Sequence, residues 1–208
     1  PNVAVFDNWI HEPAYLMGML AGGLTESDKI GVVGAMPVPE VNRLVNAFIA
    51  GAKMQNPDAV VMVSFINSWF DPAAAKEAAL AMIDNGADVL YAERFGVIDA
   101  AAENNLFAFG NMSDQNELAP DLVVTSAVWN MDPTIEYLIK QVSAGTFTAQ
   151  DLKDFSMMSK GGASLASFHS TESKIPADLL AAVKAKEAEI MSGIFRVDVN
   201  EAQPAGSN

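Results

Sequence analysis

The stretch "KIGVVGAMPVPEVNRLVNAFIAGAKMQ" at residues 29–55 predicts a buried strand followed by a helix. Its first eight residues are mostly apolar or small, which is typical of a strand covered on both faces of a parallel sheet. Further along, apolar side chains recur at helical spacing, at Val41, Leu44, Val45 and Phe48. A strand followed by an amphipathic helix is the unit from which parallel sheets are built, so its recurrence decides the fold.

The same unit recurs along the chain. Other apolar runs of strand length occur at residues 3–6, 59–66, 86–92, 106–111 and 122–129. Helical patterns separate most of these runs, and we expect Gly22-Gly23 to end the first helix. A long amphipathic helix is expected over residues 175–193, before a disordered tail at residues 202–208. The alternation predicts an α/β fold with a mostly parallel sheet.

Composition excludes several classes of partner and site. The chain has 208 residues, 12 Lys and Arg against 26 Asp and Glu, and a net charge of -14, which disfavours nucleic acid as a partner. It has no cysteine, so it contains neither a disulfide nor a thiolate metal site. No apolar run approaches the roughly 18 residues of a membrane span. The first residues lack the basic region of a signal peptide, so we expect a mature or truncated chain.

Three tryptophans follow predicted strands and precede acid-proline pairs, at Trp9, Trp69 and Trp129. Loops at the carboxyl ends of parallel strands form the ligand crevice, so we expect the three indoles to face one cleft. Each indole offers a flat face for stacking, and Asn8, Asn67 and Asn130 offer the paired donors and acceptors that suit a base edge. A planar heterocycle is the ligand that this pattern favours. The alternative for each indole is packing beneath a loop.

The remaining polar motifs do not converge on a catalytic centre. The pair Glu93-Arg94 ends a predicted strand, and either contacts a ligand or forms an internal ion pair. "GVVGAMPVPE" at residues 31–40 lacks the third glycine of a dinucleotide fingerprint and has prolines in the phosphate loop. Neither histidine has a partner at metal-ligand spacing, and surface or capping roles are expected for His11 and His169. We therefore expect no enzyme activity, no metal and no cofactor.

Four blocks of sequence are similar to one protein family: "EPAYLMGMLAG", "KIGVVGAMPVPEVNRLVNAFIAGAKMQNPDA", "NSWFDPAAAKEAALAMIDNGADVL" and "NMSDQNELAPDLVVTSAVWNMDP". Together they resemble the BMP (basic membrane protein) family of substrate-binding proteins of bacterial ABC importers, which includes purine nucleoside receptors. The resemblance runs from about Val3 to Arg196. It implies a periplasmic-binding-protein type I fold, in which two Rossmann-like lobes with parallel sheets close around a ligand.

The resemblance also implies a division of the chain. Residues 1–9 would end the first lobe and cross over, residues 10–125 would form the second α/β lobe, and residues 126–208 would return to the first lobe and add a C-terminal helix and tail. Family members are longer at the amino end by on the order of 100 residues. The first lobe is therefore expected to be incomplete in this chain, as in a fragment or a truncated product.

The base-stacking position of the family corresponds to Trp69, with Asn67 beside it. Nucleoside-binding members carry an acid before the "SDQN" block and a lysine after the "TS" pair, where this chain has Met112 and Trp129. Losing both charges removes hydrogen bonds worth about 1.5–3 kcal/mol each, which favours a nucleobase such as adenine over a nucleoside. The other expected polar contacts are Glu93 and Asp114, and Trp9 or Trp129 would box the ring.

The resemblance implies a small-molecule ligand, ABC permease subunits as partners and a periplasmic or membrane-anchored extracytoplasmic location. The alternatives are a doubly wound α/β enzyme acting on nucleosides, a sensor lobe coupled to a partner, and a fragment that binds nothing. A sensor would need a DNA-binding or membrane segment, and we find neither in the sequence. Turnover of a nucleoside or reduction of a nicotinamide would reveal the enzyme.

Overall fold

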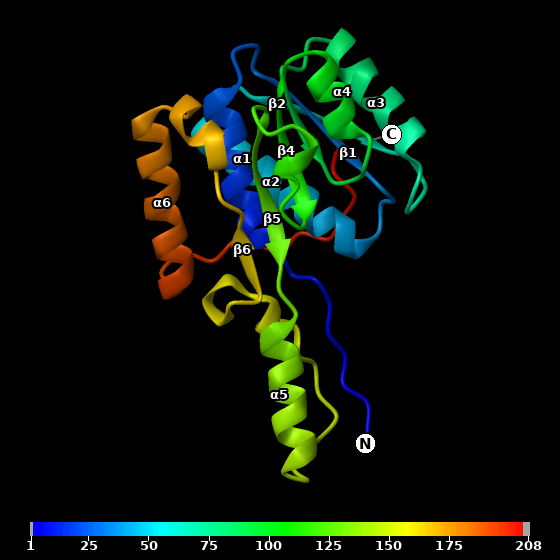
Figure 1. Ribbon diagram of the computed structural model, residues 1–208, viewed down its shortest axis with the longest axis vertical. Coiled ribbons are helices and arrows are strands. Elements are labelled where there is room, and N and C mark those ends of the chain that lie inside the picture. Colours follow the sequence, from blue (N-terminus) through cyan, green and yellow to red (C-terminus); the bar gives the residue numbers. More distant parts are fainter. Residues whose placement is uncertain (1, 206–208) are drawn as a thin grey trace.

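The computed structural model describes residues 2–205 and contains one six-stranded sheet, in the order β2-β1-β3-β4-β5-β6 (Figure 1). The first five strands are parallel, and β6 pairs antiparallel with β5. The strands are β1 (Lys29–Gly34), β2 (Val60–Phe65), β3 (Val89–Ala92), β4 (Phe107–Met112), β5 (Val123–Trp129) and β6 (Ala163–Leu165). The prediction of an α/β fold with a mostly parallel sheet is confirmed.

Helices cover both faces of the sheet (Figure 1). One face packs against α1 (His11–Leu24) and α2 (Pro39–Gln55), with α6 (Ala177–Ser192) against α1, and the other packs against α3 (Pro72–Asp84) and α4 (Val97–Glu103). The remaining helix, α5 (Asp132–Ser143), projects away from the sheet. Short 3₁₀ helices form at Asn116–Leu118, Lys153–Ser156, Met158–Lys160 and His169–Lys174.

Glycines in α1 and α2 let the two helices pack backbone to backbone. A Cβ on Gly18 would lie 2.0 Å from the carbonyl oxygen of Phe48, and one on Gly51 would lie 1.9 Å from that of Tyr15. Gly22 faces Ala52 in the same contact. The expectation that Gly22-Gly23 ends the first helix is therefore wrong, because α1 continues to Leu24 and Gly22 serves close packing instead.

Two other local expectations also fail. Residues 3–6 do not form a strand, because Val5 makes only an isolated parallel bridge to Asp151. The acid-proline motif caps a helix only once: the Asp71 carboxylate accepts a hydrogen bond from the backbone N–H of Ala74 at 3.0 Å at the start of α3. At α1 and α5 the N-cap positions are Ile10 and Met131, which have no capping side-chain bond.

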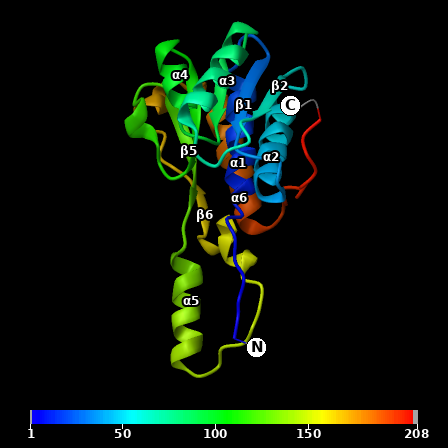
Figure 2. The same cartoon turned by 90° about the vertical axis from the view of Figure 1, so that its right-hand side faces the viewer.

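The structure divides visibly into a body and an arm (Figures 1 and 2). The body comprises the sheet, α1 to α4 and α6. The arm comprises residues 2–9 and 130–162, in which α5 runs beside the amino-terminal segment. Tyr137 of α5 packs on Phe155 with ring centroids 4.7 Å apart, which holds the arm together. The arm leaves the body at the carboxyl end of β5, so it lies on the side where the parallel strands end.

The expected division into lobes at residues 1–9, 10–125 and 126–208 stays a prediction. Within the structure, residue 126 lies inside β5, and β6 and α6 pack on the body. The tail is tied to α2 up to Ala202, because the amide of Asn46 donates to the carbonyl oxygens of Asn200 and Ala202 at 2.8 Å each. Of the tail that we expected to be disordered, residues 206–208 lie outside the described residues.

Within residues 2–205, none of the helices is both long enough and apolar enough to cross a bilayer.

Candidate functional site

Polar side chains gather where the parallel strands end. We call this group the strand-end cluster and define it by its members: Asn8, Glu40, Glu93, Arg94 and Asn111. They come from the arm, the start of α2, the carboxyl end of β3 and the carboxyl half of β4. In open α/β sheets, ligands bind in the crevice outside the carboxyl ends of the strands. The cluster therefore occupies the position in the fold where a ligand is expected.

Glu93 is the centre of the cluster and is only 3% exposed. Its Oε2 accepts from the backbone N–H of Ala35 at 2.9 Å and from Nε of Arg94 at 2.8 Å. Burial raises the pKa of Glu93, while the hydrogen bond and charge of Arg94 oppose that shift. Of the two alternatives for Glu93-Arg94, the structure shows the internal ion pair.

Asn111 links Glu93 to the core. Its Oδ1 accepts from the hydroxyl of Tyr91 at 2.9 Å, and its Nδ2 donates to Oε1 of Glu93 at 3.4 Å. Both Tyr91 and Asn111 are buried, with 0% and 3% exposure. The chain of hydrogen bonds fixes the Glu93 carboxyl group in one orientation, as a preorganised binding site requires.

Asn8, which belongs to the arm, and Glu40 form one side of the cluster. Burial raises the pKa of Glu40, and a hydrogen bond with Asn8 opposes that shift. Asn8 is 8% exposed, and its Oδ1 has no hydrogen-bond partner within the described residues. Buried polar atoms are normally paired, so this oxygen is a free acceptor at the site.

Trp69 and Asn67 lie in the loop that follows β2. Trp69 is 50% exposed, and the guanidinium carbon of Arg94 lies 5.5 Å from its ring centroid. Arg94 also donates to the carbonyl oxygen of Trp69 at 3.2 Å. Asn67 is exposed and has a positive φ of 55°, a left-handed conformation that asparagine tolerates well. Arg94 thus joins Trp69 to Glu93, while the free face of the indole stays open to solvent.

The other two tryptophans lie in different surroundings. Trp9 is half-buried beneath Arg43, whose guanidinium carbon is 4.1 Å from the indole centroid. Trp129 packs against the core, and its Nε1 is buried without a hydrogen-bond partner in the described part of the chain. No two of the three indoles are in ring contact among residues 2–205. A single cleft shared by all three stays a prediction.

Met112 and Asp114 follow β4 and differ in what they contact. The thioether of Met112 accepts from Nδ2 of Asn8 at 3.2 Å, which places it beside the strand-end cluster. The carboxylate of Asp114 lies 2.7 Å from Nε2 of His169 and is exposed. Asp114 is therefore already paired on the body surface.

Sequence reasoning missed Glu40, Asn111 and Arg43 as members of this region. Glu40 occupies the first turn of the helix after β1, and Asn111 lies near the end of β4, both beside the expected crevice. Topological position was the available signal, because polar residues at strand ends and following helix starts converge there. The expectation of a surface or capping role for His11 is wrong, since His11 is 2% exposed and α1 has no side-chain capping hydrogen bond.

The cluster offers both hydrogen-bond donors and hydrogen-bond acceptors. It combines two carboxyl groups, two amides and a guanidinium beside an indole face, which suits the recognition of a flat polar ring. Among residues 2–205 there is no group of three His, Asp or Glu side chains placed to hold a metal ion.

Comparison with known proteins identifies the family. Residues 2–193 match the family model Bmp, described as ABC transporter substrate-binding protein PnrA-like. A purine-binding protein of Brucella abortus is 32% identical over 194 residues, which cover 92% of this chain and 54% of that protein. A putative ABC transporter glucose-binding protein of Haloferax volcanii is 36% identical over 143 residues, covering 66% of this chain and 37% of that protein.

A solved structure extends the similarity to the fold. The ABC transporter solute-binding protein from Conexibacter woesei superposes with a TM-score of 0.73 at 27% identity, over 93% of this chain and 64% of that chain. The chain thus spans between about a third and two thirds of the length of these relatives. The periplasmic-binding-protein fold, incomplete relative to its relatives, is confirmed. This chain belongs to the Bmp family of ABC transporter substrate-binding proteins.

Proposed function

We propose that this chain forms the second lobe of a solute receptor and part of its first lobe, and that the strand-end cluster recognises a planar purine-type ring. The observation that carries the proposal is the half-exposed indole of Trp69 beside the guanidinium of Arg94, which the buried carboxylate of Glu93 holds in place. An indole face stacks on any base, and a guanidinium held in one orientation donates to acceptor atoms on the ring edge. Glu93, whose side chain is 0% exposed, would contribute by holding Arg94 in that orientation. Trp9 and Trp129 are less exposed and would border the ring.

Each polar contact has a place in this arrangement. Asn8 would supply its unpaired Oδ1, and Asn67 and Asp114 would contact the ligand from the loops after β2 and β4. Met112 offers no charge for a ribose hydroxyl, so a free nucleobase such as adenine fits better than a nucleoside. The purine-binding relative from Brucella abortus supports this ligand class.

The receptor would work by closure rather than by chemistry. A ligand that touches both lobes only in the closed state shifts the population toward that state. The closed receptor would then bind, from the outer side of the cytoplasmic membrane, to the permease subunits of an ABC importer. The arm lies on the ligand side of the body, where a closing lobe would approach (Figure 2).

Calorimetric titration of the chain with adenine, adenosine and glucose tests the proposal. We expect saturable binding of adenine, with adenosine no tighter and glucose undetectable. Trp69→Ala should weaken adenine binding by about 1–3 kcal/mol, because one base-aromatic stack is lost.

Phe70→Ala is the matched control, since Phe70 is the neighbouring aromatic residue and is 73% exposed. It should bind adenine as the parent chain does. Equal adenine affinity of Trp69→Ala and the parent chain would reject Trp69 as the stacking residue. Tighter binding of glucose than of adenine would reject the purine class.

A further inference from the structure

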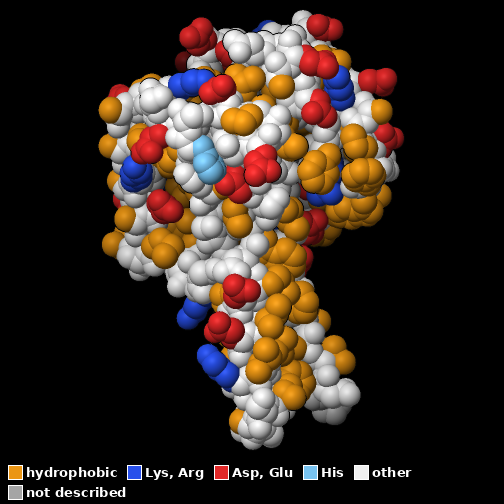
Figure 3. Space-filling view, viewed as in Figure 1, with side chains coloured by type: hydrophobic (Ala, Val, Ile, Leu, Met, Phe, Trp, Pro, Cys, Tyr) orange, Lys and Arg blue, Asp and Glu red, His pale blue; other side chains and the backbone are white. Residues whose placement is uncertain are grey.

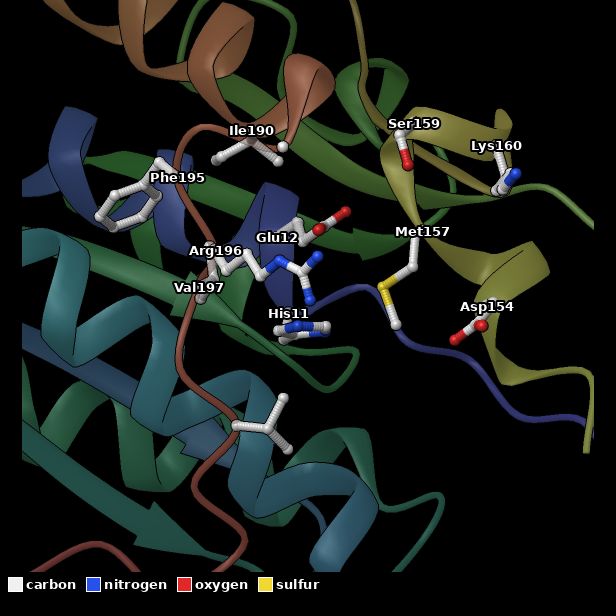
Figure 4. Close-up of a pocket in the computed structure, with 12 residues that line it drawn as sticks. His11, Glu12, Asp154, Met157, Ser159, Lys160, Ile190, Phe195, Arg196 and Val197 are labelled. Atoms are coloured by element: carbon white, nitrogen blue, oxygen red, sulfur yellow. The ribbon is translucent and has the colours of Figure 1, made fainter.

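A cavity of about 360 Å³ lies between the body and the arm, and no member of the strand-end cluster lines it. Its walls come from the start of α1, from the 3₁₀ segments of the arm and from the chain that follows α6 (Figure 4). Ligand pockets in proteins typically measure about 300–1,000 Å³, so this cavity is large enough for a small molecule.

The cavity contains charged side chains of both signs. Arg196 and Lys160 are both exposed, and neither side chain makes an ion pair or hydrogen bond within residues 2–205. Asp154 is also exposed, and Glu12 uses only Oε2, which accepts from the backbone N–H of Met158 at 2.7 Å. Two unpaired cations thus share one cavity with two carboxylates that have free oxygens.

His11 adds a buried polar atom that has no partner. It lines the cavity, is 2% exposed, and its Nδ1 makes no hydrogen bond among the described residues. Burial, with the nearby charge of Arg43, lowers the pKa of His11 to about 4, so the imidazole is neutral at pH 7 and carries one acceptor nitrogen. Figure 4 shows its ring beside the guanidinium of Arg196 and below Glu12.

One wall of the cavity is apolar. Ile190 and Val197 are buried, with 3% and 7% exposure, and Phe195 packs its ring against Tyr15 at 5.3 Å between centroids. These side chains line the cavity beside the charged groups (Figure 4). A ligand that fills this cavity therefore needs a charged end and an apolar end.

We propose that this cavity binds a zwitterionic amino acid with an apolar side chain. The ligand carboxylate would pair with Arg196 and Lys160, and its ammonium group would donate to Glu12 and His11. A plain anion would face the carboxylates of Glu12 and Asp154, and a plain cation would face the two basic groups. Only a molecule that carries both charges satisfies both sets. Because Lys160 belongs to the arm and Arg196 to the segment that follows α6, the bound ligand would connect the arm to that segment.

Three probes of one shape test the charge requirement by calorimetric titration at pH 7. They are L-leucine, 4-methylpentanoate, which lacks the ammonium group, and 3-methylbutylamine, which lacks the carboxylate. We expect saturable binding of leucine and affinities at least about tenfold weaker for the other two, since each loses one set of charge-assisted hydrogen bonds. Absence of saturable leucine binding at millimolar concentration, or equal affinity of 4-methylpentanoate, would overturn the proposal.

Substitutions then locate the site. Arg196→Gln and Glu12→Gln should each weaken leucine binding about tenfold. Lys53→Gln is the matched control, because Lys53 is another exposed basic residue that makes no side-chain hydrogen bond or ion pair within residues 2–205, and it lies on α2 outside the cavity. Circular dichroism and the thermal midpoint verify that each variant is folded. Unchanged leucine affinity in both Arg196→Gln and Glu12→Gln would overturn the assignment to this cavity.

Trp69→Ala separates this proposal from the one for the strand-end cluster. It should leave leucine affinity unchanged while it weakens adenine binding. Parallel loss of leucine binding in Trp69→Ala would show that leucine occupies the strand-end cluster, and would overturn the second site.

Discussion

The guanidinium carbon of Arg43 lies 4.1 Å from the ring centroid of Trp9, so a buried arginine on α2 holds the segment that connects the arm to the body. The Arg43 side chain is only 3% exposed and pairs with Asp7 and with Glu201 of the tail. It also donates to the carbonyl oxygen of Asn8 at 3.0 Å. One side chain thus fixes the amino-terminal segment, the tail and one edge of the strand-end cluster.

Replacement of Arg43 by methionine should lower the free energy of unfolding by about 2–4 kcal/mol, because a buried carbonyl group and two carboxylates lose their cationic partner. Urea denaturation followed by tryptophan fluorescence measures this loss. Hydrogen exchange of residues 5–9 should accelerate in the same variant. Arg196→Met is the control, since Arg196 has no such contacts, and its unfolding free energy should change by less than about 0.5 kcal/mol. Equal effects of the two substitutions would contradict the assigned role.

Gly51→Ala should destabilise the chain severely, because the new Cβ would lie 1.9 Å from the carbonyl oxygen of Tyr15 on the facing helix. Backbone cannot move aside as a side chain can, so we expect a loss of more than about 3 kcal/mol or failure to fold. Gly23→Ala is the matched comparison. Its Cβ meets only the flexible end of Leu179, and helix propensity favours alanine by up to about 1 kcal/mol. Thermal melts of both variants distinguish the two cases, and similar midpoints would contradict the close-packing account.

The sequence predicts the sheet because strand length, apolar runs and helical spacing are local signals. It also predicts that Asp71 caps α3, since an acid before proline is a local signal for a helix start. The sequence does not predict the hydrogen bond between Asn111 and Glu93, because that bond depends on which strands become neighbours and in what register. Gly22 shows the other limit, since glycine signals both a helix end and a close helix contact, and only the tertiary partner decides between them.

The buried imidazole of His11 should make stability depend on pH. Its pKa falls from 6.5 to about 4 on folding, so between these values the unfolded chain binds more protons and stability is lost as pH decreases. At pH 5 this one group lowers the free energy of unfolding by about 2 kcal/mol relative to pH 7. Urea denaturation at both pH values should show that His11→Gln lacks this contribution.

The buried acids act in the opposite direction. Burial raises the pKa of Glu93, so its contribution is largest at low pH and is lost as pH rises above 4.5. The comparison of His11→Gln with the parent chain at both pH values cancels this background, which both proteins share. An identical loss of stability between pH 7 and pH 5 in the two proteins would contradict a lowered pKa for His11.

Apolar side chains on the arm should make this chain of 208 residues self-associate. Ile135, Ile139 and Val142 lie three to four residues apart on α5 and are 45%, 60% and 64% exposed. Hydrophobic side chains gather along the arm in Figure 3. Contiguous exposed apolar patches drive association, and salt should strengthen it by screening the repulsion between chains of net charge -14.

Ile139→Glu should shift the chain toward the monomer without lowering its thermal midpoint, because it removes exposed apolar area and breaks no buried contact. Sedimentation velocity at several protein concentrations measures the shift. Ser143→Glu adds the same charge to an exposed polar position of the same helix and should leave association nearly unchanged. If the parent chain sediments as a monomer at every concentration, or if both variants shift equally, the apolar face of α5 is not the cause of association.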